Sequence, residues 1–360
     1  MNRSSPLRVR APLQDSGTVE FASDDGGLRS ALEQAIAETA EADSAGDRPA
    51  MRFRYENGNA YLRLMSTLQR RLAEDDARRI GCRIRHEREG GEEEPPADSG
   101  DASSAWRPLS ELFGKVGGIS VPDYILYRHF TLYMQPIVRP SGEAVGYELL
   151  TRPMPDQTPF RPSELFEIAS RVRQHGFLDR AARQTAIRMG AAHLPPGFKR
   201  FVNFLPSSLH RPDDCLKCTF DEIRSTGTDP GDCVFEVVES EPLDDPRLPD
   251  IFEVYRREGI RLAIDDVGSG FATLGAVERL QPDYVKMDRR WISRCDEDPA
   301  KQKYIDTLLD RVSRFHGVVL AEGVERPEEW TYLKKAGVPL FQGYLFGRAK
   351  PVPSAMPAIR

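Results

Sequence analysis

The chain has 360 residues, 39% of them hydrophobic and 29% charged, and its formal net charge at pH 7 is −6. This composition is typical of a soluble protein of about two domains, and the acidic balance argues against a protein that binds nucleic-acid duplexes. No apolar run reaches about 18 residues, so we expect no membrane span, and the N-terminus lacks the apolar core of a signal peptide. We therefore expect a cytoplasmic protein.

The cysteine pattern is consistent with that compartment. The five cysteines are Cys82, Cys215, Cys218, Cys233 and Cys295. An odd, scattered set without an export signal predicts reduced thiols. Cys215 and Cys218 form a lone C-x-x-C pair, which falls short of the four ligands that a structural zinc ion needs.

The first 120 residues give weak signals. Residues 1–45 are rich in Ser, Ala, Asp and Gly and predict a flexible segment with one short helix in LRSALEQAIAETA. Residues 46–87 predict a small α/β unit, with two strands in residues 51–65 around an Asn-Gly turn and a helix after them. Residues 88–104 are a charged Pro/Gly-rich linker, and we expect a connecting helix within 105–120.

From residue 121 onward the pattern becomes regular. Two apolar runs, HFTLYMQPIV and EAVGYELLTR, flank the tight-turn sequence Arg-Pro-Ser-Gly and predict a hairpin, hence an antiparallel pair. Helical and strand patterns then alternate over about 240 residues, which is long enough for a (β/α)-barrel. The alternative is an open doubly wound sheet, although the sequence lacks a G-x-G-x-x-G fingerprint.

One strand pattern ends in two adjacent carboxylates. In RLAIDDVGSG, Asp265 and Asp266 follow an apolar run and precede a glycine-rich turn. Two buried neighbouring carboxylates repel each other and call for a cation. The alternative for this fragment alone is a pair of capping or turn aspartates, which βα loops often contain.

Polar residues recur at the ends of the other predicted strands. They are Glu148, Asn203, Glu236, Lys286, Glu322 and Gln342. In a (β/α)-barrel such positions converge on one mouth, and five converging carboxylates require cations. Oxygen ligands favour Mg²⁺ or Mn²⁺ over zinc, and two-metal sites commonly cleave phosphodiesters. Each acid taken singly could instead be a cap or an ion-pair partner.

Two basic residues have alternative interpretations. Lys286 alone is typical of a structural ion pair, but beside metal ions it could orient a water molecule or neutralise phosphate charge. Arg152 follows Glu148 by four residues and could bind a phosphate with both arms of its guanidinium, or be a surface arginine.

Residues 121–353 resemble the EAL family of cyclic-di-GMP phosphodiesterases. The resemblance covers about two-thirds of the chain. The resemblance rests on motifs in the family's order: YMQPIV; ELLTR for E-A-L-x-R; FVNFLP for the N-x-S-P strand; EVVE for E-x-x-E; DDVGSG for D-D-F-G-T/S-G; KMD; EGVE; and QGY. The departures are Leu149, Leu205, Val267, Ala272 and Thr273. None of them replaces a ligand, but those in the loop of residues 267–275 bear on the rate.

The resemblance implies a barrel whose first strand is antiparallel, in a domain of residues 121–360. It implies that Glu148, Asn203, Glu236 and Asp265 hold one Mg²⁺ or Mn²⁺ ion, and that Asp265, Asp266 and Glu322 hold a second, with Asp265 bridging. Lys286 would position the nucleophilic water, so that the catalytic set is Glu148, Lys286, Asp266 and Glu322. Gln135, Arg152 and Gln342 would bind the dinucleotide, and Glu239 would anchor the loop after Asp266.

The function implied is hydrolysis of cyclic-di-GMP to linear 5′-pGpG by a homodimeric enzyme. The main alternative is a receptor that binds cyclic-di-GMP without efficient hydrolysis, and a weaker one is a hydrolase of another phosphodiester. The complete set of acids favours the enzyme.

Overall fold

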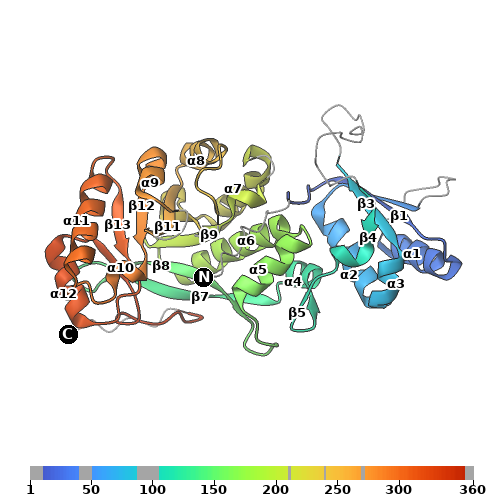
Figure 1. Ribbon diagram of the computed structural model, residues 1–360, viewed down its shortest axis with the longest axis horizontal. Helices are drawn as coiled ribbons and strands as arrows, with labels where there is room; N and C mark the ends of the chain where they lie inside the picture. The colour runs from blue at the N-terminus through green and yellow to red at the C-terminus, as the bar shows by residue number, and fades with distance from the viewer. Residues whose placement is uncertain are drawn as a thin grey trace. The chain divides into compact units, whose positions relative to one another are not determined.

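The computed structural model describes residues 11–39, 51–86, 105–209, 212–238, 241–268 and 272–352, without the side chains of residues 212–214. The predicted linker of residues 88–104 and Glu239 lie outside these ranges. The chain divides into two compact units, one of residues 1–130 with 153–178 and one of residues 131–152 with 179–360 (Figure 1).

The first unit contains a four-stranded antiparallel sheet in the order β2-β1-β3-β4. Its strands are Gly17–Ala22 (β1), Met51–Tyr55 (β2), Gly81–Arg85 (β3) and Arg107–Pro108 (β4). In β2, Phe53 and Tyr55 are buried whereas Arg52 and Arg54 are exposed, because successive side chains of a strand point to opposite faces. The helices of this unit are Gly26–Thr39 (α1), Gly58–Arg71 (α2), Glu74–Arg79 (α3), Val121–Tyr127 (α4) and Pro162–Arg171 (α5).

Three expectations for this unit were wrong. The second strand predicted within residues 51–65 is the start of α2, because the Asn57 side chain accepts a hydrogen bond from Ala60 N and caps a helix in place of forming a turn. The predicted connecting helix is a single 3-10 turn, Leu109–Leu112, followed by the short strands Lys115–Val116 (β5) and Ile119–Ser120 (β6). Within the predicted flexible segment of residues 1–45, β1 is an ordered strand, whereas α1 is the helix predicted in LRSALEQAIAETA.

The second unit is a closed eight-stranded barrel in the order β10-β11-β12-β13-β14-β7-β8-β9. Its strands are Phe130–Val138 (β7), Ala144–Pro153 (β8), Lys199–Phe204 (β9), Cys233–Val237 (β10), Arg261–Val267 (β11), Tyr284–Met287 (β12), Val318–Ala321 (β13) and Leu340–Gln342 (β14). Strands β8 to β14 run parallel, whereas β7 is antiparallel to β14. This confirms the predicted barrel with an antiparallel first strand and excludes the open sheet.

Helices surround these strands (Figure 1). They are His175–His193 (α6), Pro212–Thr226 (α7), Leu248–Arg257 (α8), Leu274–Leu280 (α9), Arg289–Ile292 (α10), Pro299–Ser313 (α11) and Pro327–Ala336 (α12). Helical patterns in residues 179–194, 245–259, 273–281, 299–317 and 326–337 predicted α6, α8, α9, α11 and α12. They missed α7 and the single turn α10. No helix in the described ranges is long and apolar enough to cross a membrane.

The floor of the barrel interior is apolar. Ile137, Phe201, Val234, Ala263 and Leu320 form one buried cluster, each from a different strand. Four of these residues lie two positions before a polar residue of the predicted site, namely Asn203, Glu236, Asp265 and Glu322. Side chains two apart on a strand share a face, so this layer places the polar residues above it at the C-terminal mouth of the barrel.

Candidate metal centre

The polar residues of the predicted site come from consecutive barrel strands. Glu148 lies on β8, Asn203 on β9, Glu236 on β10, Asp265 and Asp266 on β11, and Lys286 on β12; Glu322 directly follows β13 and Gln342 ends β14. Glu236 is directly opposite Asn203 in the ladder of β10 and β9. The carboxyl ends of the parallel strands therefore bring these side chains together, as the spacing of the motifs predicted.

A β-bulge explains how two adjacent aspartates reach the same site. Neighbouring residues of a regular strand point to opposite faces. Between β11 and β12 the register shifts from Ile264 opposite Val285 to Val267 opposite Met287, so two residues of β11 face one of β12. Asp266 has a φ of 49°, in the left-handed region, and its amide donates to Asp265 Oδ1 at 2.9 Å. The bulge turns Asp266 away from the regular alternation.

Lys286 is the centre of the carboxylate cluster. Its Nζ lies 2.8 Å from Glu322 Oε1 and 2.9 Å from Glu236 Oε2. Asp265 Oδ1 is 3.0 Å away and Glu148 Oε1 is 3.5 Å away. The lysine side chain is 1% exposed, so these ion pairs are shielded from solvent and strong.

Two further contacts complete the cluster. Gln342 Nε2 donates to Glu148 Oε2 at 2.6 Å. Asp265, Asp266 and Glu322 each offer a carboxylate oxygen, and these oxygens lie within 4.8 Å of one another. A group of three carboxylates at this spacing is a suitable cradle for a hard divalent cation.

Burial dominates the electrostatics of the site. Burial and the negative charges of Glu148 and Asp265 raise the pKa of Glu236 well above its ordinary value, against the opposing effect of Lys286. Burial also raises the pKa of Glu322 well above its usual range, and Asp265 adds to that shift. Burial also favours a higher pKa for Glu148. The positive charge of Lys286 and several hydrogen bonds, the largest effect among them that of Gln342, outweigh burial, so the pKa of Glu148 is lowered.

The donor set fits divalent metal ions. The cluster contains one ammonium and five carboxylates, and burial raises the pKa of Glu236 and of Glu322, which disfavours their ionised forms. Two divalent cations would offset the four remaining negative charges and satisfy the buried oxygens. Both oxygens of Glu236 are buried, and within the described residues they have no hydrogen bond besides the ion pair with Lys286. All of the ligand atoms are oxygens, which suits Mg²⁺ or Mn²⁺.

A family model for the EAL domain matches residues 121–349. The chain belongs to the EAL-domain family. The barrel and the carboxylate cluster of this EAL domain both lie within the matched residues.

Curated proteins similar to this chain have names that describe different roles. The blue light- and temperature-regulated antirepressor BluF of Escherichia coli K12 is 31% identical over 62% of this chain and 54% of its own length. The probable cyclic di-GMP phosphodiesterase PdeG of the same organism is 30% identical over 59% of this chain and 43% of its own length. The chain thus spans about half the length of these relatives.

Solved EAL structures have the same fold. A standalone EAL protein from Vibrio cholerae O395, in a c-di-GMP-bound form, aligns with a TM-score of 0.56 at 29% identity over 63% of this chain and 95% of that one. BlrP1 of Klebsiella pneumoniae, in a complex with manganese and cyclic diGMP, aligns with a TM-score of 0.56 at 30% identity over 62% of this chain and 56% of that one.

The three residues expected to bind substrate differ in their contacts. Gln342 joins the cluster through Glu148. Gln135 Nε2 donates to Gly347 O at 3.4 Å, and Arg152 Nη1 donates to Thr151 O at 2.8 Å, both of them main-chain oxygens. Among the described residues, neither side chain hydrogen-bonds to the carboxylate cluster, so the expected role of Gln135 and Arg152 stays a prediction.

Sequence reasoning missed the residues that support the turn after Asn203. Asp179 accepts hydrogen bonds from Leu205 N at 3.1 Å, Ser208 Oγ at 2.8 Å and Arg183 Nε at 2.9 Å. Asp179 and Arg183 are both buried on α6. Their spacing of four residues is typical of a helical ion pair, and this was the available signal.

Proposed function

We propose that this EAL domain is a metal-dependent phosphodiesterase that hydrolyses cyclic-di-GMP to linear 5′-pGpG. The observation that carries the proposal is the convergence of five carboxylates, Asn203 and Lys286 at the mouth of the barrel. Homologous domains crystallised with cyclic-di-GMP, and in one case with manganese, support the choice of ligand and metal.

The resemblance to the EAL family suggests the ligand roles, and the positions of the side chains support them. Glu148, Asn203, Glu236 and Asp265 would hold one Mg²⁺ or Mn²⁺ ion, and Asp265, Asp266 and Glu322 the other. Bound divalent cations would supply Lewis-acid stabilisation of the charge on the phosphate oxygens. The bridging role proposed for Asp265 is supported by its place in the three-carboxylate group and by its contact with Lys286, 3.0 Å away.

Lys286 would act on the water molecule. Its ammonium has three N–H donors, which in this structure all face carboxylates. With the carboxylates bound to metal, an N–H of Lys286 becomes available to hold the attacking water at the phosphate. The water oxygen would bond to phosphorus as the P–O3′ bond breaks, and the proton that the water releases would balance the proton that the 3′ oxygen gains, which leaves a 5′-phosphate and a 3′-hydroxyl.

A turnover assay tests this proposal. The full chain is incubated with cyclic-di-GMP and Mn²⁺, and the nucleotides are separated by ion-exchange chromatography. We expect pGpG to accumulate with Mn²⁺ and not with EDTA. Cyclic-di-AMP and a nitrophenyl phosphodiester serve as competing substrates that test specificity.

A cyclic-di-GMP receptor without hydrolysis is the second candidate. It is favoured by the similarity to BluF, which is named as an antirepressor. Binding of cyclic-di-GMP in calorimetry, with no pGpG formed over hours, would establish the receptor and exclude the enzyme. We also propose a homodimer, which light scattering at the assay concentration would detect as twice the chain mass.

A further inference from the structure

A short segment after β12 contacts the loop after β11 and the loop after β13, which adjoin the three-carboxylate group. It comprises Asp288–Cys295 and includes the single-turn helix α10. The loop after β11 follows Asp265 and Asp266, and the loop after β13 begins with Glu322. The segment makes contacts with both loops, and it contributes no ligand of its own.

Trp291 holds the β11 loop. Its Nε1 donates to Gly268 O at 3.3 Å, and Asp288 N donates to Val267 O at 3.3 Å. The indole stacks on Tyr304 with the ring centroids 3.8 Å apart. Gly268 has a φ of 97°, and a Cβ there would lie 2.2 Å from Trp291 Nε1 and 2.5 Å from the Tyr304 hydroxyl. The main chain two residues after Asp266 is therefore pressed directly against this aromatic pair.

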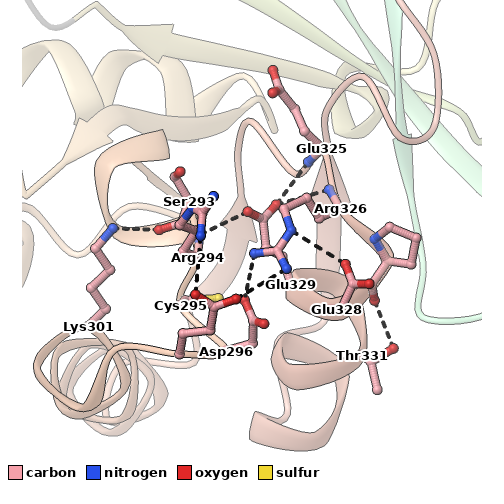
Figure 2. A network of polar contacts seen from close by, with 12 residues as sticks. Ser293, Arg294, Cys295, Asp296, Lys301, Glu325, Arg326, Glu328, Glu329 and Thr331 are labelled. Atoms are coloured by element: carbon pink, nitrogen blue, oxygen red, sulfur yellow. Dashed lines mark hydrogen bonds and ion pairs between the residues drawn. The ribbon is translucent and has the colours of Figure 1, made fainter.

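Glu329 holds the β13 loop. Its Oε2 accepts from Glu325 N at 3.1 Å and from Arg326 N at 3.1 Å, while its Oε1 accepts from Arg294 N at 2.9 Å. Figure 2 shows this carboxylate between the three main-chain amides. Glu329 is 2% exposed, so its charge-assisted hydrogen bonds are protected from water. They tie the loop that starts at Glu322 to the segment that ends at Cys295.

Two further contacts join β12 and the segment after it to the loop after β13. Arg289 Nη2 ion-pairs with Glu325 Oε2 at 2.8 Å, and Glu322 N donates to Met287 O at 3.2 Å. The loops next to Asp266 and Glu322 are thus both held by contacts with the same eight residues, Asp288–Cys295. Asp266 also occupies the left-handed region, a conformation that persists only where the surrounding structure imposes it.

We propose that Trp291 and Glu329 are positioning residues that fix the separation between Asp265–Asp266 and Glu322, and so set the affinity of this group for a divalent cation. Neither side chain is a ligand. Residues that orient metal ligands typically change metal affinity by about 10- to 100-fold when they are replaced. The inference rests on the proposed function only in assuming that the three carboxylates bind a cation.

Two pairs of matched substitutions separate positioning from general packing. Trp291→Phe removes the N–H that Gly268 O accepts, whereas Trp330→Phe removes a buried indole N–H that has no hydrogen-bond partner among the described residues. Glu329→Gln removes one of the acceptor oxygens, whereas Glu328→Gln changes a neighbouring, exposed carboxylate whose one ion pair among the described residues is with the side chain of Arg326.

The readout is Mn²⁺ affinity, measured by calorimetry on the full chain without nucleotide, together with urea unfolding in EDTA. We expect Trp291→Phe and Glu329→Gln to weaken Mn²⁺ binding by about tenfold, while the two control variants keep the wild-type affinity. The double variant should weaken binding by less than the product of the single effects, because both residues act on one spacing.

Equal Mn²⁺ affinity in Trp291→Phe and Trp330→Phe would overturn the inference, and so would a wild-type chain that binds no Mn²⁺. A chain that binds Mn²⁺ but forms no pGpG contradicts only the proposed function, because the affinities of the four variants can still be compared. Should Glu329→Gln fail to fold in EDTA, the tryptophan pair decides the question.

Discussion

The ammonium of Lys286 lies 2.8 Å from Glu322 Oε1, so a buried lysine of β12 neutralises a carboxylate from the loop after β13. Three more carboxylates share this ammonium, at 2.9 to 3.5 Å. The cation of Lys286 is therefore what holds the cluster together when no metal is bound. This gives the lysine a role in stability that is separate from its proposed role in catalysis.

Replacing this lysine should destabilise the metal-free protein. Lys286→Met leaves buried carboxylates without their counter-ion, which typically costs about 3–5 kcal/mol of unfolding free energy. Urea unfolding in EDTA measures the loss. Lys335→Met, at an exposed position of α12, is the control and should change stability by less than about 0.5 kcal/mol. Equal stability of the two variants would show that the cluster does not need the lysine.

Loss of a proposed metal-ligating carboxylate should abolish turnover without unfolding the barrel. We expect Glu148→Ala and Asp265→Ala to lower kcat by about 1000-fold or more, because each removes a carboxylate that would neutralise the reaction's cations. Circular dichroism and a cooperative thermal transition should be retained. Arg188→Ala, on the exposed side of α6, is a control that should keep its activity. If either acid variant retained turnover, the site would lie elsewhere.

Divalent cations should stabilise the folded chain. An ion that binds the native state but not the unfolded chain adds about 2.7 kcal/mol at a concentration 100-fold above its Kd. The Tm should rise on addition of Mn²⁺ or Mg²⁺ and return on addition of EDTA. The rise should be much smaller in Asp265→Asn, which removes one charge from both proposed ion sites. A wild-type Tm that does not change on addition of Mn²⁺ or Mg²⁺ would contradict the cation site.

The buried pair on α6 should matter far more than the exposed pair on the same helix. Asp179 and Arg183 are 3% and 1% exposed, whereas Arg188, which pairs with Glu222, is 58% exposed. Arg183→Ala leaves Asp179 buried without its charge partner and should cost about 3–5 kcal/mol. Arg188→Ala should cost at most about 1 kcal/mol. Chemical denaturation compares the two, and similar losses would refute the assigned role of Asp179.

Thiol reactivity should divide the cysteines into two groups. Burial raises the pKa of Cys82, Cys233 and Cys295 to about 12, so at about pH 8 only about one such thiol in ten thousand is the reactive thiolate. Cys215 and Cys218 are partly exposed, and all five are unpaired. Iodoacetamide should therefore label Cys215 or Cys218 first in the native chain, as mass spectrometry of peptides would show. Early labelling of Cys295 would mean that the α10–α11 region opens readily.

The sequence alone determined the barrel and most of its strands. Strands β9, β10 and β11 each contain adjacent apolar residues, at 201–202, 233–235 and 262–264, and adjacent apolar residues are typical of parallel strands buried on both faces. Glu148, Asn203, Glu236, Asp265 and Glu322 could be selected because each ends or follows such a run. Local signals were weaker in the first 120 residues, where Asn57 has the composition of a turn but caps a helix.

Only the tertiary structure decided how the selected residues meet. In a regular strand, the side chains of Asp265 and Asp266 would point to opposite faces. The register between β11 and β12 shifts at these two residues, and the resulting bulge redirects them. It likewise took the closed barrel to bring Lys286 within ion-pair distance of four carboxylates from four other strands or their ends. Trp291 and Glu329 carry no motif, since their contacts form only when the loops after β11, β12 and β13 lie side by side.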